Sequence, residues 1–234
     1  CVVAALRGWP DGVIDAYSRQ AYEYVGDIGK TPTIREFFGR YTELHPFLSL
    51  HAKAQPPGPV ALLWLFSFVV GVAPLALSLA SLCFAALALL PLYGWVRDWA
   101  GPRTALTACA LYSLTPAVVL FSATSADTLF PPFMLLALWL FGRALTHRRL
   151  DTAVAAGAAY GGLALLKFTL LTTGAWFGFV GLWQAFYWRR FALIARTAVL
   201  MAGGALALQG LVWLWSGFDL IGTFQLAYAQ FAED

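Results

Sequence analysis

The apolar run that begins at Val60 restricts the fold of this chain more than any other feature. From there to residue 217 the sequence is almost wholly apolar, and its charged residues occur only in small clusters. Over the whole chain 60% of residues are hydrophobic and 12% are charged, whereas soluble domains carry roughly 25% charged residues. Ten Trp and nine Tyr residues suit the aromatic belts of membrane interfaces. We therefore predict an all-α polytopic membrane protein.

The length of a membrane-spanning helix divides this run into segments. Such a helix needs roughly 20 apolar residues. The predicted spans are 75–96, 104–121, 128–145, 152–171, 174–188 and 191–215. The segments AAGAAYGGLALL and MAGGALALQG are rich in small residues, which favour close helix packing in lipid. We expect a six-span transmembrane bundle over residues 74–217.

Arginines mark one side of this predicted bundle. They lie in or beside the links between the first and second, third and fourth, and fifth and sixth spans: Arg97, Arg103, Arg143, Arg148, Arg149, Arg189, Arg190 and Arg196. Because positively charged loops stay in the cytoplasm, this side is predicted to be cytoplasmic. Asp127, the turn at Thr172 and Thr173, and Asp219 then lie on the extracytoplasmic side, together with the polar loop 7–58.

The remaining segments are assigned from the same alternation of sides. Residues 1–6, CVVAAL, are interpreted as the end of a further span, and residues 218–234 as the start of an outer segment of a longer protein. If residues 60–73 crossed the membrane, Arg97 and Arg103 would lie outside. Residues 59–73 are therefore predicted to form an interfacial helix, with Pro59 in its first turn. The loop 7–58 is expected to carry juxtamembrane helices.

Cysteine chemistry is not indicated. The three cysteines, Cys1, Cys83 and Cys109, show no CxxC or Cys/His metal spacing. They are interpreted as small hydrophobic side chains. No disulfide is predicted.

Acidic residues stand out on the predicted outer side. Asp15 follows the first partial span in WPDGVIDAY, with Asp11 nearby, and Asp127 lies in the tight link FSATSADTLFPPF. Each has a structural alternative. Asp15 could be an ordinary loop carboxylate or a helix cap, Asp11 before Gly12 is typical of a turn, and Asp127 or Ser125 could cap a helix. A charge at membrane depth often marks a functional site. Both interpretations stay open from the sequence.

Basic residues accompany these acids. Lys167 lies late in the span 152–171, where it could extend toward the interface or bind an anionic phosphate. His45, His51 and Lys53 precede the motif AQPPGPV and are either ordinary exposed loop residues or phosphate ligands. Acids and bases from separate segments on one face are the composition expected of a site at the membrane surface.

The order of these motifs resembles that of the GT-C membrane glycosyltransferases, in particular bacterial relatives of the protein O-mannosyltransferases and of the lipid A aminoarabinose transferase. The resemblance covers nearly all of the chain. Its motifs are DGVIDAYSRQAYEYV, AQPPGPVALLWL, VRDWAGPRTALTACALYSLTPAVVLFSATSAD and AAYGGLALLKF. It implies a GT-C-like transmembrane helix bundle with a helical outer loop after the first span.

The resemblance also implies an activity, the transfer of a sugar from a polyprenyl-phosphate donor on the extracytoplasmic face. Asp15 and Asp127 would be the catalytic acids. The implied substrate-binding residues are Asp11, His45, His51, Lys53 and Lys167. Ala16 stands where the family often has a second acid, so no cofactor is assigned and a divalent metal is left open. Gln55 stands where relatives often carry Lys or His before Pro-Pro.

Two other function classes remain, a lipid or solute transporter (or flippase) and a non-catalytic membrane subunit. A transporter is expected to show internal repeats and polar residues at mid-membrane, and neither is evident. The expected partners are the polyprenyl-phosphate-linked donor and membrane lipid, with no nucleic acid and an unspecified acceptor. The expected location is the bacterial plasma membrane. The enzyme interpretation predicts that Asp15 and Asp127 approach one outer cavity, with Lys53 or Lys167 on its wall, and it fails if the two acids open onto different faces.

Overall fold

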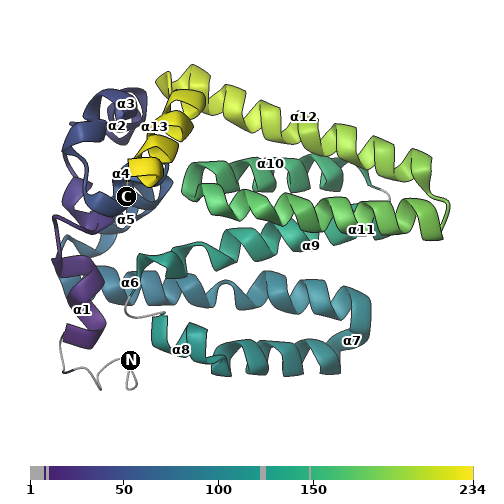
Figure 1. Cartoon of the computed structure of the whole chain (residues 1–234). Helices are drawn as coiled ribbons and strands as arrows, with labels where there is room; N and C mark the ends of the chain where they lie inside the picture. The colour runs from purple at the N-terminus through teal and green to yellow at the C-terminus, as the bar shows by residue number, and fades with distance from the viewer. Residues whose placement is uncertain (1–7, 9–10, 122–124, 148, 234) are drawn as a thin grey trace.

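The computed structural model describes residues 8, 11–121, 125–147 and 149–233, and within these ranges every regular element is helical. Figure 1 shows a bundle of long helices with a group of short helices at one end. Three helical stretches are long and apolar enough to cross a membrane: Pro74–Leu114, Ala126–His147 and Phe191–Ser216. The chain is thus an all-α polytopic membrane protein, as the composition predicts.

The short helices at one end of the bundle come from the N-terminal part of the chain. They are α1 (Asp11–Ser18), η2 (Tyr24–Asp27), α2 (Ile34–Gly39), α3 (Tyr41–Leu44), η3 (His45–Phe47) and α4 (Leu50–Lys53). Asp27 joins two of them, because its fully buried carboxylate accepts hydrogen bonds from the Ser49 amide at 3.1 Å and the Ser49 hydroxyl at 2.6 Å. Lys30 forms an ion pair with the same carboxylate. These contacts hold η2 against the start of α4.

Aromatic side chains attach this group of helices to the bundle. The Phe38 ring lies 5.7 Å from Trp215 and 5.4 Å from Phe218, measured between ring centroids. Edge-to-face pairs of this kind add stabilisation beyond the area they bury. The last helix, α13 (Leu220–Glu233), lies against α3 and α4.

Helix α5 (Gly58–Val70) follows the Pro-Pro motif. Pro59 occupies its first turn, where a missing N–H costs no hydrogen bond. Gly71 ends the helix with a φ of 77°, a conformation that a residue with a β-carbon rarely adopts. The position of helix α5 at the membrane interface stays a prediction.

The predicted span 75–96 is broken in the structure. It consists of α6 (Pro74–Ala86) and the first arm of α7 (Leu89–Leu114). Pro91 accounts for the break, because it has no N–H to donate to the Leu87 carbonyl and its ring crowds that carbonyl. Helix α7 then folds back at Gly101, which has a φ of 84°, so its second arm runs beside the first (Figure 1). The short α8 (Pro116–Phe121) continues this return.

The remaining elements complete the bundle. They are η4 (Ala126–Leu129), α9 (Pro131–His147), α10 (Leu150–Leu166), η5 (Phe168–Thr172), α11 (Thr173–Tyr187) and α12 (Phe191–Ser216). A β-carbon at Gly157 of α10 would overlap the backbone of Met201, and one at Gly204 of α12 would overlap the backbone of Val154. The two glycine-rich segments therefore bring α10 and α12 into close contact, as their small residues predict.

The two ends of the bundle differ in charge. The fold-back of α7, the α9–α10 link and the α11–α12 link lie at one end, on the right in Figure 1, and they carry Arg97, Arg103, Arg149, Arg189 and Arg190. The short N-terminal helices and η4 lie at the opposite end. The structure thus collects the arginine-bearing links at one end, in agreement with the alternation seen in the sequence.

Candidate active site

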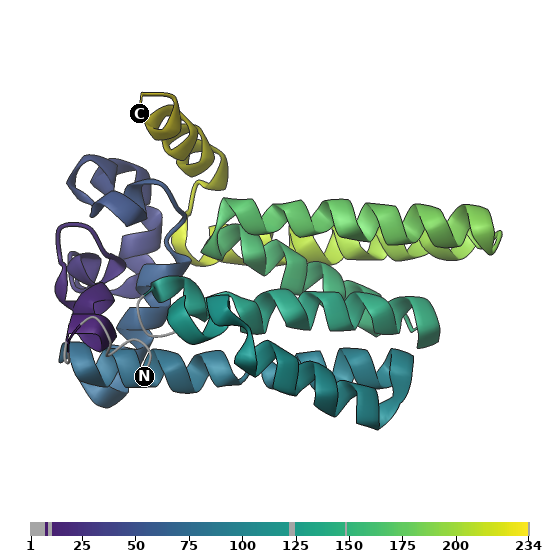
Figure 2. The same cartoon turned by 60° about the horizontal axis from the view of Figure 1, so that its bottom comes forward.

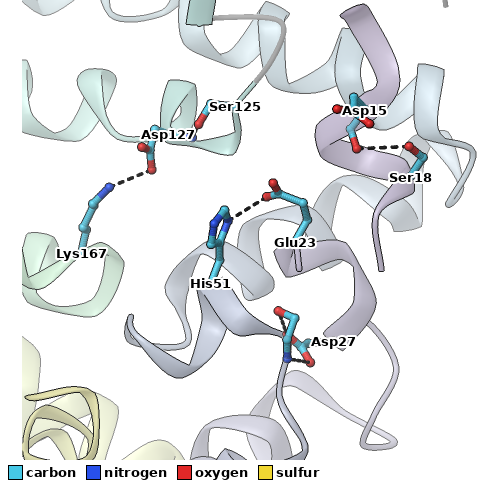
Figure 3. A network of polar contacts seen from close by, with 9 residues as sticks. Asp15, Ser18, Glu23, Asp27, His51, Ser125, Asp127 and Lys167 are labelled. Atoms are coloured by element: carbon cyan, nitrogen blue, oxygen red, sulfur yellow. Dashed lines mark hydrogen bonds and ion pairs between the residues drawn. The ribbon is translucent and has the colours of Figure 1, made fainter. Parts of the chain in front are cut away.

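A polar cavity of about 250 Å³ opens at the end of the bundle that carries the short helices. Four separate parts of the chain line it. The lining residues are Glu23, Tyr24, His51, Ala54, Gln55, Ser125, Ala126, Asp127 and Lys167. Two acids and two bases therefore face one cavity. They form two acid–base pairs, Asp127 with Lys167 and Glu23 with His51 (Figure 3).

Asp127 and Lys167 form the first pair. The Lys167 ammonium donates to the Asp127 carboxylate at 2.9 Å. The Asp127 carboxylate is not used as the cap of η4. The Ser125 hydroxyl caps this helix instead, because it accepts the hydrogen bond from the Asp127 amide at 3.1 Å. Of the two roles considered for Asp127, the helix cap is thus filled by Ser125.

Lys167 reaches the cavity because α10 ends one residue before it. Its backbone is extended, with φ −161° and ψ 125°, and its side chain is only 23% exposed. The ammonium also lies 5.4 Å from the centre of the Phe130 ring, within the range of a cation–π contact. Lys167 therefore turns toward Asp127 and the cavity.

Glu23 and His51 form the second pair. Nδ1 of His51 lies 3.1 Å from the Glu23 carboxylate. This hydrogen bond raises the pKa of His51 above its usual value, because the carboxylate favours the charged imidazolium. With Nδ1 held by Glu23, Nε2 is the ring nitrogen left for a ligand. Tyr24, beside His51, is buried, and burial raises the pKa of its phenol well above the usual value, so it lines the cavity as a neutral group.

Tyr41 holds the segment that carries His51 and Gln55. Its buried hydroxyl lies 2.7 Å from the Ala52 carbonyl and 2.8 Å from the Gln55 carbonyl. Gln55 is 9% exposed, and within the described residues its Oε1 atom has no hydrogen-bond partner. At the position where the family resemblance implies a base, this chain therefore brings a neutral amide to the cavity wall.

Asp15, His45 and Lys53 are not among the residues that line this cavity. Asp15 is the main difference from expectation: its carboxylate forms an ion pair with Arg19 at 2.6 Å, on a helix that packs against α6, and it does not share the wall with Asp127. His45 lies 3.0 Å from the Lys53 carbonyl, so its ring is used within the loop. Asp11 begins α1, but its side chain is outside the part of the chain that the structure describes.

Glu23 is the residue that sequence reasoning missed. Its only signal is an acid between two tyrosines, AYEYV, in a loop with several other acids. The pairing with His51 depends on how η2 and α4 fold together, which local sequence does not reveal. Among the described residues no three His, Cys, Asp or Glu side chains gather as metal ligands would.

Comparison with known families extends this description. A family model described as dolichyl-phosphate-mannose-protein mannosyltransferase matches residues 54–215. The match begins beside Gln55 and includes Asp127 and Lys167. No curated protein and no solved structure matches the chain. Because the matched region covers well over half of the chain, this protein belongs to the dolichyl-phosphate-mannose-protein mannosyltransferase family of GT-C-type membrane glycosyltransferases.

Proposed function

We propose that this glycosyltransferase moves a sugar from a polyprenyl-phosphate donor to an acceptor hydroxyl, and that the reaction takes place in the polar cavity. The observation that carries the proposal is the convergence of Asp127, Lys167 and the Glu23–His51 pair on one cavity. A carboxylate beside fixed cations is the arrangement that such a displacement needs, because a proton leaves one reactant while negative charge grows on the other.

The proposed reaction is a displacement at the anomeric carbon of the donor sugar. The acceptor oxygen forms a bond to that carbon, and the bond from the carbon to the phosphate oxygen breaks. The electron pair of the broken bond stays on the phosphate, and the proton of the acceptor hydroxyl passes to a carboxylate. Of the two carboxylates that line the cavity, we assign this proton to Asp127, because Glu23 is paired with His51.

The cations of the cavity would stabilise the leaving phosphate. An ammonium has three N–H donors, and Lys167 uses one of them on Asp127, so two remain for phosphate oxygens. Nε2 of protonated His51 adds a further donor. Neutral Gln55 adds no charge, so in this chain the cationic role assigned by the resemblance to the residue before Pro-Pro passes to His51 and Lys167.

Asp15 remains a second candidate for the base, the role that the family resemblance implies for it. It lies in the motif DGVIDAYSRQAYEYV, but Arg19 holds its carboxylate. Asp15→Asn and Asp127→Asn therefore separate the two assignments. If Asp127 is the base, its substitution abolishes transfer while Asp15→Asn retains most of it; the reverse result assigns the base to Asp15.

A second cavity supports a polyprenyl donor. It measures about 670 Å³ and is almost entirely apolar. It lies among α9, α10, η5, α11 and α12, with Phe141, Tyr160, Leu171, Gly178 and Met201 among its lining residues. Leu171 belongs to η5, which follows directly after Lys167. A donor with its phosphate at Lys167 could therefore place part of its apolar tail in this cavity.

The arginine-bearing end of the bundle supports the orientation. Positively charged links remain on the cytoplasmic side, so the polar cavity at the other end would face the extracytoplasmic side. The acceptor would then be a hydroxyl compound that reaches that surface.

The test uses the full-length protein in proteoliposomes with radiolabelled polyprenyl-phosphate mannose and an extract of cell-envelope acceptors. We expect transfer of label by the wild type, none by Asp127→Asn and strongly reduced transfer by Lys167→Gln. Glu43→Gln is the matched control, because Glu43 is an exposed acid of the same group of helices. Movement of intact donor between leaflets without transfer of its sugar would instead support the flippase alternative.

A further inference from the structure

A third cavity lies at the arginine-bearing end, away from the polar cavity. It measures about 350 Å³ and is lined by Arg189, Arg190, Ala192, Leu193 and Arg196. Figure 2 shows the link between α11 and α12 that carries it at the far tip of the bundle. We call it the arginine cavity. Nothing in the proposed sugar transfer uses it.

In the described part of the chain, the three arginines of this cavity differ from Arg97, Arg143 and Arg149 in having no acidic partner. Arg97 and Arg143 contact Asp98, and Arg149 contacts Asp151. Among the described residues no carboxylate forms an ion pair with Arg189, Arg190 or Arg196, and the three residues lie around one space. Three guanidinium groups there offer many N–H donors in the planar geometry that fits phosphate oxygens.

Exposed aromatic side chains place this cavity at a membrane interface. Trp183, Tyr187, Trp188 and Phe191 are each more than half exposed. Trp and Tyr gather at the level of the lipid headgroups. The Arg190 guanidinium lies 5.9 Å from the Trp188 ring centroid, so the arginines and the aromatic belt occupy the same level.

The backbone of the link contributes to the arrangement. Arg189 has a φ of 53°, the one described residue other than glycine with a positive φ. This left-handed conformation is uncommon for a residue with a β-carbon. It turns the chain directly before α12, with Arg189 and Arg190 on the same cavity as Arg196 of the helix.

We propose that the arginine cavity binds the phosphate of an anionic phospholipid in the leaflet at this end of the bundle. A phosphodiester of a lipid fits better than a soluble phosphate because Ala192 and Leu193 form part of the wall and the surrounding aromatic side chains suit acyl chains. Basic pockets at the cytoplasmic side of transmembrane helices bind anionic headgroups for the same electrostatic reason.

The test compares two variants of the full-length protein in nanodiscs of phosphatidylcholine with phosphatidylglycerol. Arg189→Gln/Arg190→Gln/Arg196→Gln removes the cavity arginines, and Arg97→Gln/Arg103→Gln/Arg149→Gln removes three charges elsewhere at the same end. Native mass spectrometry after transfer to detergent measures the phosphatidylglycerol that each protein retains. We expect retention by the wild type and the control, and a weakening of about five-fold for each neutralised cavity arginine.

Any one of the following results would overturn the proposal. Equal retention by the cavity variant and the wild type removes the site, and equal loss in the control variant shows a general effect of surface charge. Displacement of phosphatidylglycerol by millimolar inorganic phosphate, with equal thermal stabilisation by phosphate alone, assigns the cavity to a soluble anion. If the triple variant does not fold, the single variants Arg189→Gln, Arg190→Gln and Arg196→Gln replace it, and unchanged retention in all three contradicts the proposal.

Discussion

Lys167 donates a hydrogen bond to Asp127 at 2.9 Å across 40 residues of sequence, and this contact joins the end of α10 to η4 at the polar cavity. For activity, the positive charge of Lys167 should matter more than the size of its side chain. Lys167→Gln is expected to lower kcat by roughly 100- to 1,000-fold, since groups that stabilise developing charge have effects of this size. Lys167→Arg, which keeps the charge, should retain more activity. Steady-state kinetics with polyprenyl-phosphate mannose measure both variants, and equal loss in the two would contradict a role based on charge.

The Glu23–His51 pair predicts a pH dependence. Glu23 raises the pKa of His51 above its usual 6.5, so His51 is protonated at lower pH and loses its charge as the pH rises through this raised pKa. Any stability from the pair is likewise complete below 6.5 and lost across the same rise. Donor KM should therefore increase as the pH is raised through this interval.

Substitution of Glu23 tests the cause of that pH dependence. In Glu23→Gln the rise in donor KM should begin at lower pH, because the carboxylate no longer favours the imidazolium. In His51→Gln this component of the pH profile should disappear. An identical profile in wild type and Glu23→Gln would show that the pair does not set the charge of His51.

Asp27→Ala should destabilise the group of short helices. The substitution removes the acceptor for the Ser49 amide and hydroxyl and leaves Lys30 without its partner. Loss of one member of a buried charged network costs about 3 kcal/mol. Limited proteolysis should show faster cleavage within residues 28–49 than in the wild type. The exposed-acid control Glu43→Ala should be cleaved at the wild-type rate, and equal rates for all three proteins would contradict the prediction.

Tyr41→Phe should weaken both stability and activity. It removes one hydroxyl that contacts the buried Ala52 and Gln55 carbonyls. The Ala52 carbonyl keeps the Gln55 amide as a donor, and a buried polar group left without a partner costs about 1–3 kcal/mol. The segment with His51 and Gln55 would be held less firmly, so transfer should fall as well. Tyr22→Phe is the control, because Tyr22 is 58% exposed. Thermal unfolding followed by tryptophan fluorescence, with transfer assays on the same samples, measures both effects.

Two adjacent glycines of α12 give a matched comparison. A β-carbon at Gly204 would overlap the backbone of Val154 in α10, whereas one at Gly203 would have nothing within 4 Å. Gly204→Ala should therefore lower the thermal unfolding midpoint, and Gly203→Ala should leave it unchanged or raise it slightly, since Ala favours helix. Similar midpoints for the two variants would show that α10 and α12 do not pack in this way.

The sequence predicted the site residues that lie in the apolar region of the chain, where charged residues are rare. Asp127 and Lys167 stood out because each is isolated among apolar residues, and the structure brings them together. The polar loop was harder to interpret, because it has many charged residues and no local pattern separates Glu23, which lines the cavity, from Asp15, which pairs with Arg19. The break between α6 and α7 was missed because hydropathy does not register that Pro91 has no N–H with which to continue the helical hydrogen bonds.

Helices α9 and α10 each contain 17 residues, and this equality has a consequence for how the protein tolerates change. Asp127 lies shortly before the first helix of this hairpin and Lys167 immediately after the second. Because the two helices are equally long, both side chains lie at the same level along the bundle axis. One residue added to or removed from either helix would shift its end by about 1.5 Å and rotate it by about 100°. Insertions far from the cavity, in the middle of the bilayer, should thus separate the pair as effectively as a substitution within it.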